Sequence, residues 1–286
     1  MGSTDGPHEI RHLADTTSTH DYLARIWKNI PEDTPVIPYI VVLTDFQSAG
    51  RGRLGREWVA PRGTSLLMSV LVPAPPAALT WIPLTAGSVT AQILRGLLPD
   101  ARVELKWPND VLINDHKVGG VLTEYLGLRD GHAWVALGVG INLTQTREQL
   151  PSPSHTLLPS TSVALEGASV HSVTALAAQI VTELRRTLES ASLPTLRQIY
   201  ANHCVSLRSD VKVTLPDGEV VTGRGFDIDP DGALLVKSED GVVHTVRAGD
   251  VAMIGPGADP SAFSPSDTSN DPPATTPEPT TSGETL

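Results

Sequence analysis

Three arginines are threaded through glycines in the segment GRGRLGR, residues 50–56. The guanidinium groups of Arg51, Arg53 and Arg56 can form paired hydrogen bonds with carboxylate and phosphate oxygens. The glycines between them allow main-chain N–H groups to approach a ligand closely. In a chain whose formal net charge is −11, this local concentration of positive charge predicts an anion-binding loop.

The glycines of this segment also match G-x-G-x-x-G, the dinucleotide-binding fingerprint. That fold needs a strand before the glycines, a helix after them and an acidic residue about 20 positions further on. The apolar run at 38–46 supplies the strand, but Pro61 and Gly63 interrupt any following helix, and residues 70–76 read VLVPAPP. The context therefore argues against a Rossmann oxidoreductase.

A second group of candidate residues lies in KWPNDVLINDHKVGG, residues 106–120. Lys106 and Lys117 are cations that could pair with phosphate or carboxylate, and Asn109 and Asp110 offer hard oxygen atoms. Mg²⁺ prefers such ligands and keeps several waters while it bridges nucleotide phosphates. Surface lysines beside a hairpin turn are the structural alternative. Next to the arginine loop, the segment favours a nucleotide site with Mg²⁺.

An aromatic residue and small residues accompany these charges. Trp107 could pack against a ligand ring, with a core tryptophan as the alternative. Gly120 would let a strand approach a ligand closely. In GVGINL, residues 138–143, small residues end a strand before Asn142, which is either a ligand contact or the polar end of a buried strand.

Hydrophobic patterning predicts the elements that position these residues. Helical spacing and capping residues favour helices over 18–30, 79–98, 172–190 and 193–204. Apolar runs favour strands over 38–46, 64–73, 102–108, 110–115, 117–128 and 132–143. The turn NDHK, residues 114–117, predicts a hairpin. After Ser209, Pro-Asp-Gly and Glu-Asp-Gly turns separate short alternating strands, which predicts a small five-stranded barrel of SH3-like size.

The predicted fold class is therefore α+β, with a mixed sheet and helices followed by a small all-β barrel. We expect a flexible N-terminus at 1–9, a catalytic domain at 10–207 and the barrel at 208–255. Residues 256–286 are rich in Pro, Ser and Thr and contain carboxylates but no lysine or arginine, so we expect a disordered acidic tail.

Composition excludes several classes of protein. Cys204 is the one cysteine, which excludes an internal disulfide and a Cys-based zinc site. No apolar run approaches the ~20 residues of a membrane span, and the N-terminus lacks a signal-peptide core, so we expect a cytoplasmic protein that does not bind membranes. An acidic chain is also a poor general binder of nucleic acid.

At the residues described above, the chain resembles the biotin protein ligases. Four motifs occur in the family's order, TTSTHDYL, QSAGRGRLGREW, LKWPNDVLINDHKVGGVLTE and GVGINL, and the resemblance covers roughly residues 10–253. It implies synthesis of biotinyl-5′-AMP from biotin and ATP, with Mg²⁺, and transfer of biotin to one lysine of a carboxyl carrier protein. It also implies the class II synthetase-like catalytic fold shared with lipoate ligases, followed by an SH3-like domain.

The resemblance also implies roles for individual residues. On the biotin side it places Ser18, Thr19, Gln47, Gly50, Arg51, Gly52, Arg53, Lys117, Gly120, Gly138 and Gly140. Among these, Lys117, Arg51 and Arg53 would be catalytic, with Lys117 at the biotin carboxylate and the arginines closing over the product. On the ATP and Mg²⁺ side, residue chemistry and resemblance together place Arg56, Trp58, Lys106, Trp107, Asn109, Asp110 and Asn142. Lys212 and Asp250 fall near positions that approach the adenylate or stabilise the domain interface.

Two departures from the family pattern qualify this expectation. His20 stands where the family usually has asparagine, and histidine is bulkier and titrates near neutrality. Only about ten residues precede the catalytic domain, so we expect no DNA-binding domain and no repressor role.

The expected partner is the biotin carboxyl carrier domain of acyl-CoA or pyruvate carboxylases. Free edge strands leave a monomer or a weak homodimer open. The alternatives are a lipoate or octanoate ligase of the same fold, which the KWPND segment argues against, and a non-enzymatic biotin sensor.

Overall fold

A seven-stranded sheet forms the larger part of the computed structural model, which describes residues 9–34, 37, 39–151 and 158–254. The strand order is β1-β2-β3-β7-β6-β5-β4; β1 runs parallel to β2, and the other neighbours are antiparallel. The strands are β1 (Glu9–Leu13), β2 (Ile40–Thr44), β3 (Ser65–Ala74), β4 (Val103–Lys106), β5 (Asp110–Ile113), β6 (His116–Arg129) and β7 (His132–Asn142).

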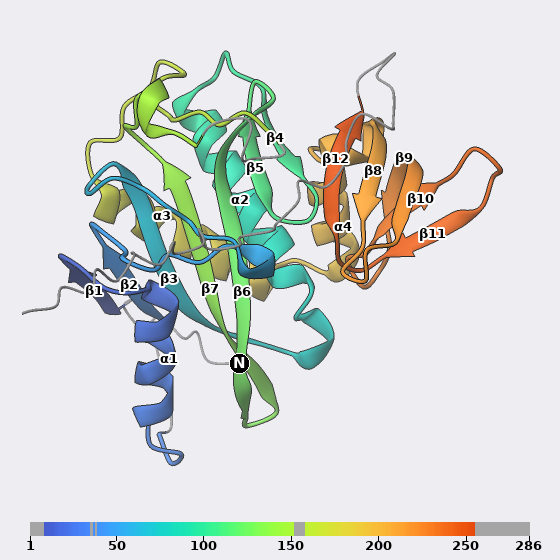
Figure 1. Ribbon diagram of the computed structural model, residues 1–286. Coiled ribbons are helices and arrows are strands. Elements are labelled where there is room, and N and C mark those ends of the chain that lie inside the picture. The colour runs from blue at the N-terminus through green and yellow to red at the C-terminus, as the bar shows by residue number, and fades with distance from the viewer. Residues whose placement is uncertain (1–8, 35–36, 38, 152–157, 255–286) are drawn as a thin grey trace, which may run out of the picture.

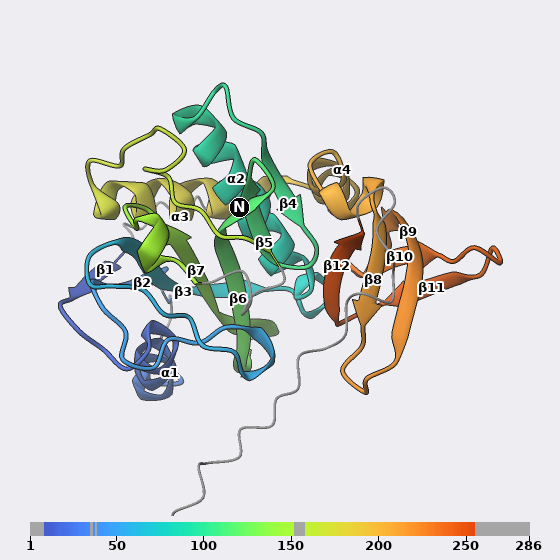
Figure 2. The same cartoon turned by 45° about the horizontal axis from the view of Figure 1, so that its top comes forward.

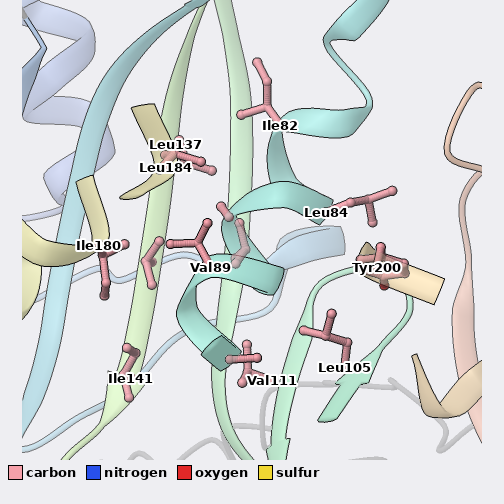
Figure 3. Close-up of a cluster of buried hydrophobic side chains, with 14 of the residues drawn as sticks. Ile82, Leu84, Val89, Leu105, Val111, Leu137, Ile141, Ile180, Leu184 and Tyr200 are labelled. Atoms are coloured by element: carbon pink, nitrogen blue, oxygen red, sulfur yellow. The ribbon is translucent and has the colours of Figure 1, made fainter. Parts of the chain in front are cut away.

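Helices cover both faces of this sheet, which is why the central strands are apolar almost throughout. The helices are α1 (Thr19–Asn29), α2 (Trp81–Leu97), α3 (Val173–Ser190) and α4 (Leu193–Ala201). Alternate residues of β2 divide between the two sides: Ile40 and Val42 join the cluster under α1, whereas Val41 and Leu43 join the main core with α2 and α3. Figure 3 shows the main core.

The second sheet is small and entirely antiparallel, in the order β11-β10-β9-β8-β12. Its strands are β8 (Asp210–Thr214), β9 (Val220–Ile228), β10 (Leu234–Lys237), β11 (Val243–Val246) and β12 (Asp250–Ile254). The turn glycines Gly218, Gly232 and Gly241 all have positive φ, so the Pro-Asp-Gly and Glu-Asp-Gly signals are confirmed as turns. Both views place this sheet beside α4 and away from α1 (Figures 1 and 2).

Two tryptophans of the larger domain reach into the smaller one. The indole N–H of Trp81 donates to the carbonyl of Pro230 at 2.7 Å, and that of Trp107 donates to the carbonyl of Gly232 at 3.0 Å. Trp107 is only 1% exposed, and its backbone N–H donates to Ser206 Oγ. Its ring therefore has no free face for a nucleotide, and the core tryptophan that the sequence left as an alternative is what the structure contains.

The expected helices and strands are confirmed to within a few residues at their ends. The hairpin at NDHK is a two-residue turn in which Asn114 and Asp115 both have positive φ, the conformation that suits a tight hairpin. The sequence missed β1, whose first residue, Glu9, falls in the segment expected to be flexible. The rest of that segment and the tail at 256–286 lie outside the described residues. Within the described chain, no helix is long and apolar enough to cross a membrane.

The Trp107 hydrogen bond generates a stability prediction. Trp107→Phe keeps an aromatic ring but leaves the carbonyl of Gly232 without its donor, which costs about 1–3 kcal/mol for a buried group. Trp134→Phe is a matched control, because Trp134 is also buried but its indole nitrogen has no hydrogen-bond partner. In urea denaturation, Trp107→Phe should lower the free energy of unfolding by that margin beyond Trp134→Phe. Equal losses would contradict the prediction.

Candidate functional site

Three glycines on β6 and β7 form one wall of the site, and aromatic rings lie directly against them. Gly120 pairs with Gly140 across the two strands. A Cβ atom on Gly140 would lie 2.9 Å from the Trp58 ring, and one on Gly138 would lie 2.1 Å from Cε1 of His20. Glycine is therefore required at 138 and 140 by close approach of the rings.

The GRGRLGR loop is closed on itself by main-chain hydrogen bonds. The N–H of Trp58 donates to the carbonyl of Gly50 at 2.9 Å, and the N–H of Gly52 donates to that of Arg56 at 2.7 Å. A Cβ on Gly50 would lie 2.3 Å from the Trp58 carbonyl oxygen. A single 3₁₀ turn, Arg53–Gly55, stands where a Rossmann fold would start its helix. The loop thus folds back and places Trp58 over the glycine wall.

The arginines of the loop contact different parts of the molecule. Arg51 pairs with Asp21 of α1 at 2.8 Å and with Glu124 of β6 at 2.9 Å. Arg53 donates to Asn109 Oδ1 at 3.3 Å, and burial lowers the pKa of its guanidinium, opposed by the charges of Asp250 and Asp110.

Arg56 forms an ion pair with Asp250, the first residue of β12. This contact matches the interface role that the sequence left open for Asp250. The loop is therefore attached at once to α1, to the KWPND turn and to the small domain. Lys212 lies on β8, opposite Ala252 of β12.

A carboxylate whose side chain is 14% exposed, that of Asp110, lies between two lysines at the junction of β4, β5 and β6. Asp110 Oδ1 is 2.6 Å from Lys117 Nζ, and its Oδ2 is 3.5 Å from Lys106 Nζ. Burial raises the pKa of Asp110, but the two ammonium groups outweigh it and hold that pKa below its usual value. Burial lowers the pKa of Lys106, which is only 4% exposed.

Lys117 is the accessible member of this cluster. Its side chain is 29% exposed, and Nζ lies 5.8 Å from the centre of the Trp58 ring. The same Nζ would be 3.7 Å from a Cβ on Gly120. Lys117 therefore presents a positive charge at the glycine wall while Asp110 fixes its position.

A chain of polar groups lies at the N-terminus of α1. Thr19 donates to Gln47 Oε1 through both its backbone N–H, at 2.8 Å, and its hydroxyl, at 3.1 Å. The hydroxyl also contacts Ser69 Oγ at 2.7 Å, and Ser69 Oγ contacts His20 Nδ1 at 2.9 Å. Ser18, the N-cap of α1, is buried beside them. The structure thus brings Ser18, Thr19 and Gln47 together.

Sequence reasoning missed three residues of this region. Ser69 is a polar residue in the middle of the apolar strand β3, which is the signal that could have revealed it. Asp21 and Glu124 lie within quoted motifs but were not singled out, because nothing in their spacing shows that they meet Arg51.

Asn142 is committed to other contacts. Its amide nitrogen donates to the carbonyl of Thr161 at 3.0 Å, and its oxygen accepts from Gln145 at 3.0 Å. Of the two readings of this residue, these contacts favour the polar end of a buried strand.

The residues expected to hold Mg²⁺ do not fit a resident ion. Both carboxylate oxygens of Asp110 face ammonium groups, and Asn109 Oδ1 accepts from Arg53. An oxygen that already faces a positive charge is a poor ligand for a divalent cation. Among the described residues, no group of three or more His, Cys, Asp or Glu side chains could hold a metal.

The lysine–aspartate cluster generates the next prediction. Asp110→Asn leaves two ammonium groups without their counter-charge and should cost about 3–5 kcal/mol of unfolding free energy. Asp115→Asn is the matched control, because Asp115 forms an exposed pair with Arg102 that contributes roughly 0–1 kcal/mol. Chemical denaturation at neutral pH measures both, and similar losses would contradict the assignment.

The same cluster predicts an acid dependence. The pKa of Asp110 is lower in the folded chain than the usual ~3.9, so its stabilisation is present above that value. It is lost as the pH falls through the folded pKa. The difference in stability between the native chain and Asp110→Asn should therefore shrink below about pH 4.

Comparisons with known proteins identify relatives of both parts of the chain. The Biotin/lipoate A/B protein ligase family matches residues 14–142, and the Biotin protein ligase C terminal domain matches residues 209–253. The biotin–[acetyl-CoA-carboxylase] ligase of Mycobacterium tuberculosis is 33% identical over 266 residues, which cover 89% of this chain and 92% of that protein. The bifunctional ligase/repressor BirA of Escherichia coli is 32% identical over 219 residues, 74% of this chain and 65% of that protein.

Solved structures share the fold. The biotin protein ligase from Aquifex aeolicus in complex with biotin and ATP has a TM-score of 0.65 at 23% identity, with 85% of this chain and 97% of that chain covered. The Mycobacterium relative extends over both domains, and the second family model is specific to biotin protein ligases. The chain belongs to the biotin protein ligase family.

Proposed function

We propose that this chain activates biotin with ATP to biotinyl-5′-AMP and transfers the biotin to a lysine of a carboxyl carrier domain. The observation that carries the chemistry is the Lys117 ammonium, fixed by Asp110 at 2.6 Å beside the glycine wall and under Trp58. Similarity to a biotin–[acetyl-CoA-carboxylase] ligase over 89% of this chain supports biotin as the substrate.

The first half-reaction joins two anions, because the biotin carboxylate attacks the α-phosphate of ATP; a bond forms from the carboxylate oxygen to the α-phosphorus, and pyrophosphate leaves. Its barrier is mainly one of position and charge. Lys117 holds the carboxylate and the α-phosphate together and stabilises the negative charge that develops on the phosphoryl oxygens. Since Asp110 is itself held by Lys106, the Lys117 ammonium is positioned before the substrates arrive.

The arginine loop protects the product of this step. Biotinyl-5′-AMP is a mixed anhydride that water would hydrolyse, so a cover over the site conserves the intermediate. Arg51 and Arg53 lie on a loop already folded against β6 and the KWPND turn. The carrier lysine then attacks the acyl carbon, and AMP leaves.

The proposed acceptor is the carboxyl carrier domain of a biotin-dependent carboxylase. The name of the Mycobacterium relative identifies acetyl-CoA carboxylase as that protein's partner. We extend this to the carrier domains of acyl-CoA or pyruvate carboxylases for the present chain.

A lipoate ligase of the same fold is the nearest alternative. The catalytic family model covers both substrates, but the match at 209–253 is to the biotin protein ligase C-terminal domain. Biotin-dependent ATP–pyrophosphate exchange without lipoate-dependent exchange would support the proposal, and the reverse result would overturn it.

Lys117 generates a catalytic prediction. Lys117→Ala should lower biotin-dependent ATP–pyrophosphate exchange by roughly 10²–10³-fold, the typical effect of removing one preorganised donor. Lys237→Ala, in the exposed strand end of β10, is the control and should exchange normally. Near-normal exchange by Lys117→Ala, in protein with an unchanged circular dichroism spectrum, would refute the assigned role.

Arg53 generates a separate prediction about retention of the intermediate. Arg53→Gly removes the contact to Asn109 and should release more biotinyl-5′-AMP into solution, measured as free adenylate and as biotin added to unrelated lysines. Arg53→Lys keeps the charge and should leak less than Arg53→Gly. If the glycine variant retains the intermediate as the native chain does, Arg53 does not act in the cover.

A further inference from the structure

The register between β5 and β6 shifts by one residue at Val118, which forms a β-bulge directly after Lys117. Residues that lie opposite each other on neighbouring strands face the same side, and Lys117 lies opposite Leu112, two positions from Asp110. A shift of one residue moves side chains from one face of a sheet to the other. The bulge therefore turns Lys117 to the face of Asp110, where the two side chains meet at 2.6 Å.

The backbone of Lys117 pairs with a segment outside the seven strands. The pairing of β6 with β7 begins only at Gly119. The N–H of Lys117 instead donates to the carbonyl of Pro159 at 2.8 Å, and its carbonyl accepts from the N–H of Thr161 at 2.9 Å. Residues 159–161 are therefore a short parallel neighbour of β6 at the position of Lys117.

Thr161 is held by all three of its polar groups. Its N–H reaches Lys117, its carbonyl accepts from the Asn142 amide at 3.0 Å, and its hydroxyl donates to Glu166 Oε1 at 2.6 Å. Thr161 is fully buried, and a buried hydroxyl needs a hydrogen-bond partner. The position of the 159–161 segment therefore depends on the carboxylate of Glu166.

Glu166 also contacts the turn between β5 and β6. Its second oxygen, Oε2, accepts from Asn114 Nδ2 at 2.7 Å. The orientation of that amide is fixed, because the backbone N–H of Arg102 can only donate and reaches Asn114 Oδ1 at 3.1 Å. The two oxygens of Glu166 thus accept from the turn that precedes Lys117 and from the segment that lies beside it.

We propose that Glu166 is a positioning residue for Lys117. It acts through the backbone, because its carboxylate joins the turn to the 159–161 segment and so maintains the bulge that turns the ammonium group towards Asp110. A carboxylate suits this role because both of its oxygens accept, whereas an amide accepts only at its oxygen. The inference rests on the proposed function, in which Lys117 acts on the biotin carboxylate and the α-phosphate.

Amide hydrogen exchange of the full chain, followed by NMR, tests the structural part without any substrate. Glu166→Gln leaves one of the two donors without an acceptor, so the N–H groups of Lys117 and Thr161 should exchange at least about tenfold faster. The N–H of Leu137, in the middle of β7, reports the stability of the whole sheet and should change much less. Glu189→Gln, at the exposed end of α3, is the control and should leave all three rates unchanged.

Biotin-dependent ATP–pyrophosphate exchange tests the link to catalysis. Glu166→Gln should lower it roughly 10- to 100-fold, because misplacing a catalytic group by about 1 Å can cost 10²-fold. In the Lys117→Ala background, with enough enzyme to measure the residual exchange, the same substitution should lower it by less than about twofold, because its effect passes through Lys117. A general effect on the fold would give the same fractional loss in both backgrounds.

A conservative pair at Thr161 provides the second test. Thr161→Ser keeps the hydroxyl that donates to Glu166 and should exchange pyrophosphate at nearly the native rate. Thr161→Val removes only that donor and should show the loss expected for Glu166→Gln. Equal rates in the serine and valine variants would contradict the role of this hydrogen bond.

Three results would overturn the inference alone: native amide exchange at Lys117 and Thr161 in Glu166→Gln, native pyrophosphate exchange in that variant, or an equal fractional loss with and without Lys117. Absence of biotin-dependent exchange by the native chain would instead overturn the proposed function. The amide measurement would then still decide whether Glu166 holds the backbone of Lys117.

Discussion

One carboxylate between two ammonium groups organises the catalytic side of this molecule. Asp110 starts β5, Lys106 ends β4 opposite it, and Lys117 lies near the start of β6, so the cluster ties three neighbouring strands together. The cluster has two positive charges and one negative charge, so its net charge is positive. Because Lys106 is buried, Lys117 is the lysine that carries this charge to the surface. The more exposed cation of the cluster, Lys117, is therefore a product of how the sheet edge is assembled.

The glycine wall depends on the same strands. Gly120 and Gly140 lie opposite each other on β6 and β7, and Trp58 occupies the space that side chains would otherwise fill. Glycines in a central sheet provide no side chains for packing. The aromatic rings of Trp58 and His20 fill the space that those side chains would occupy. The wall is thus smooth on the strand side and is covered by rings that come from a loop and a helix.

The fold was largely predictable because its signals are local. Apolar runs, capping serines and turn glycines each act within a few residues. They located the four α-helices and every strand of the larger sheet except β1, which is short and polar. The site was predictable only as a set of residues. The pairing of Arg51 with Asp21 and Glu124, and the burial of Trp107 against Gly232, depend on which distant segments meet, and spacing along the chain does not contain that information.

The ion pair between Arg56 and Asp250 connects the arginine loop of the larger domain to the small domain. The loop and most of the site belong to the larger domain, but this ion pair makes the position of the loop depend on the small domain as well. The small domain supports the loop from one side. The hydrogen bonds from Trp81 to Pro230 and from Trp107 to Gly232 hold that domain in place against the larger one. Under the proposed function, sequence changes in the small domain would therefore alter how long the adenylate is retained without changing any group that contacts it.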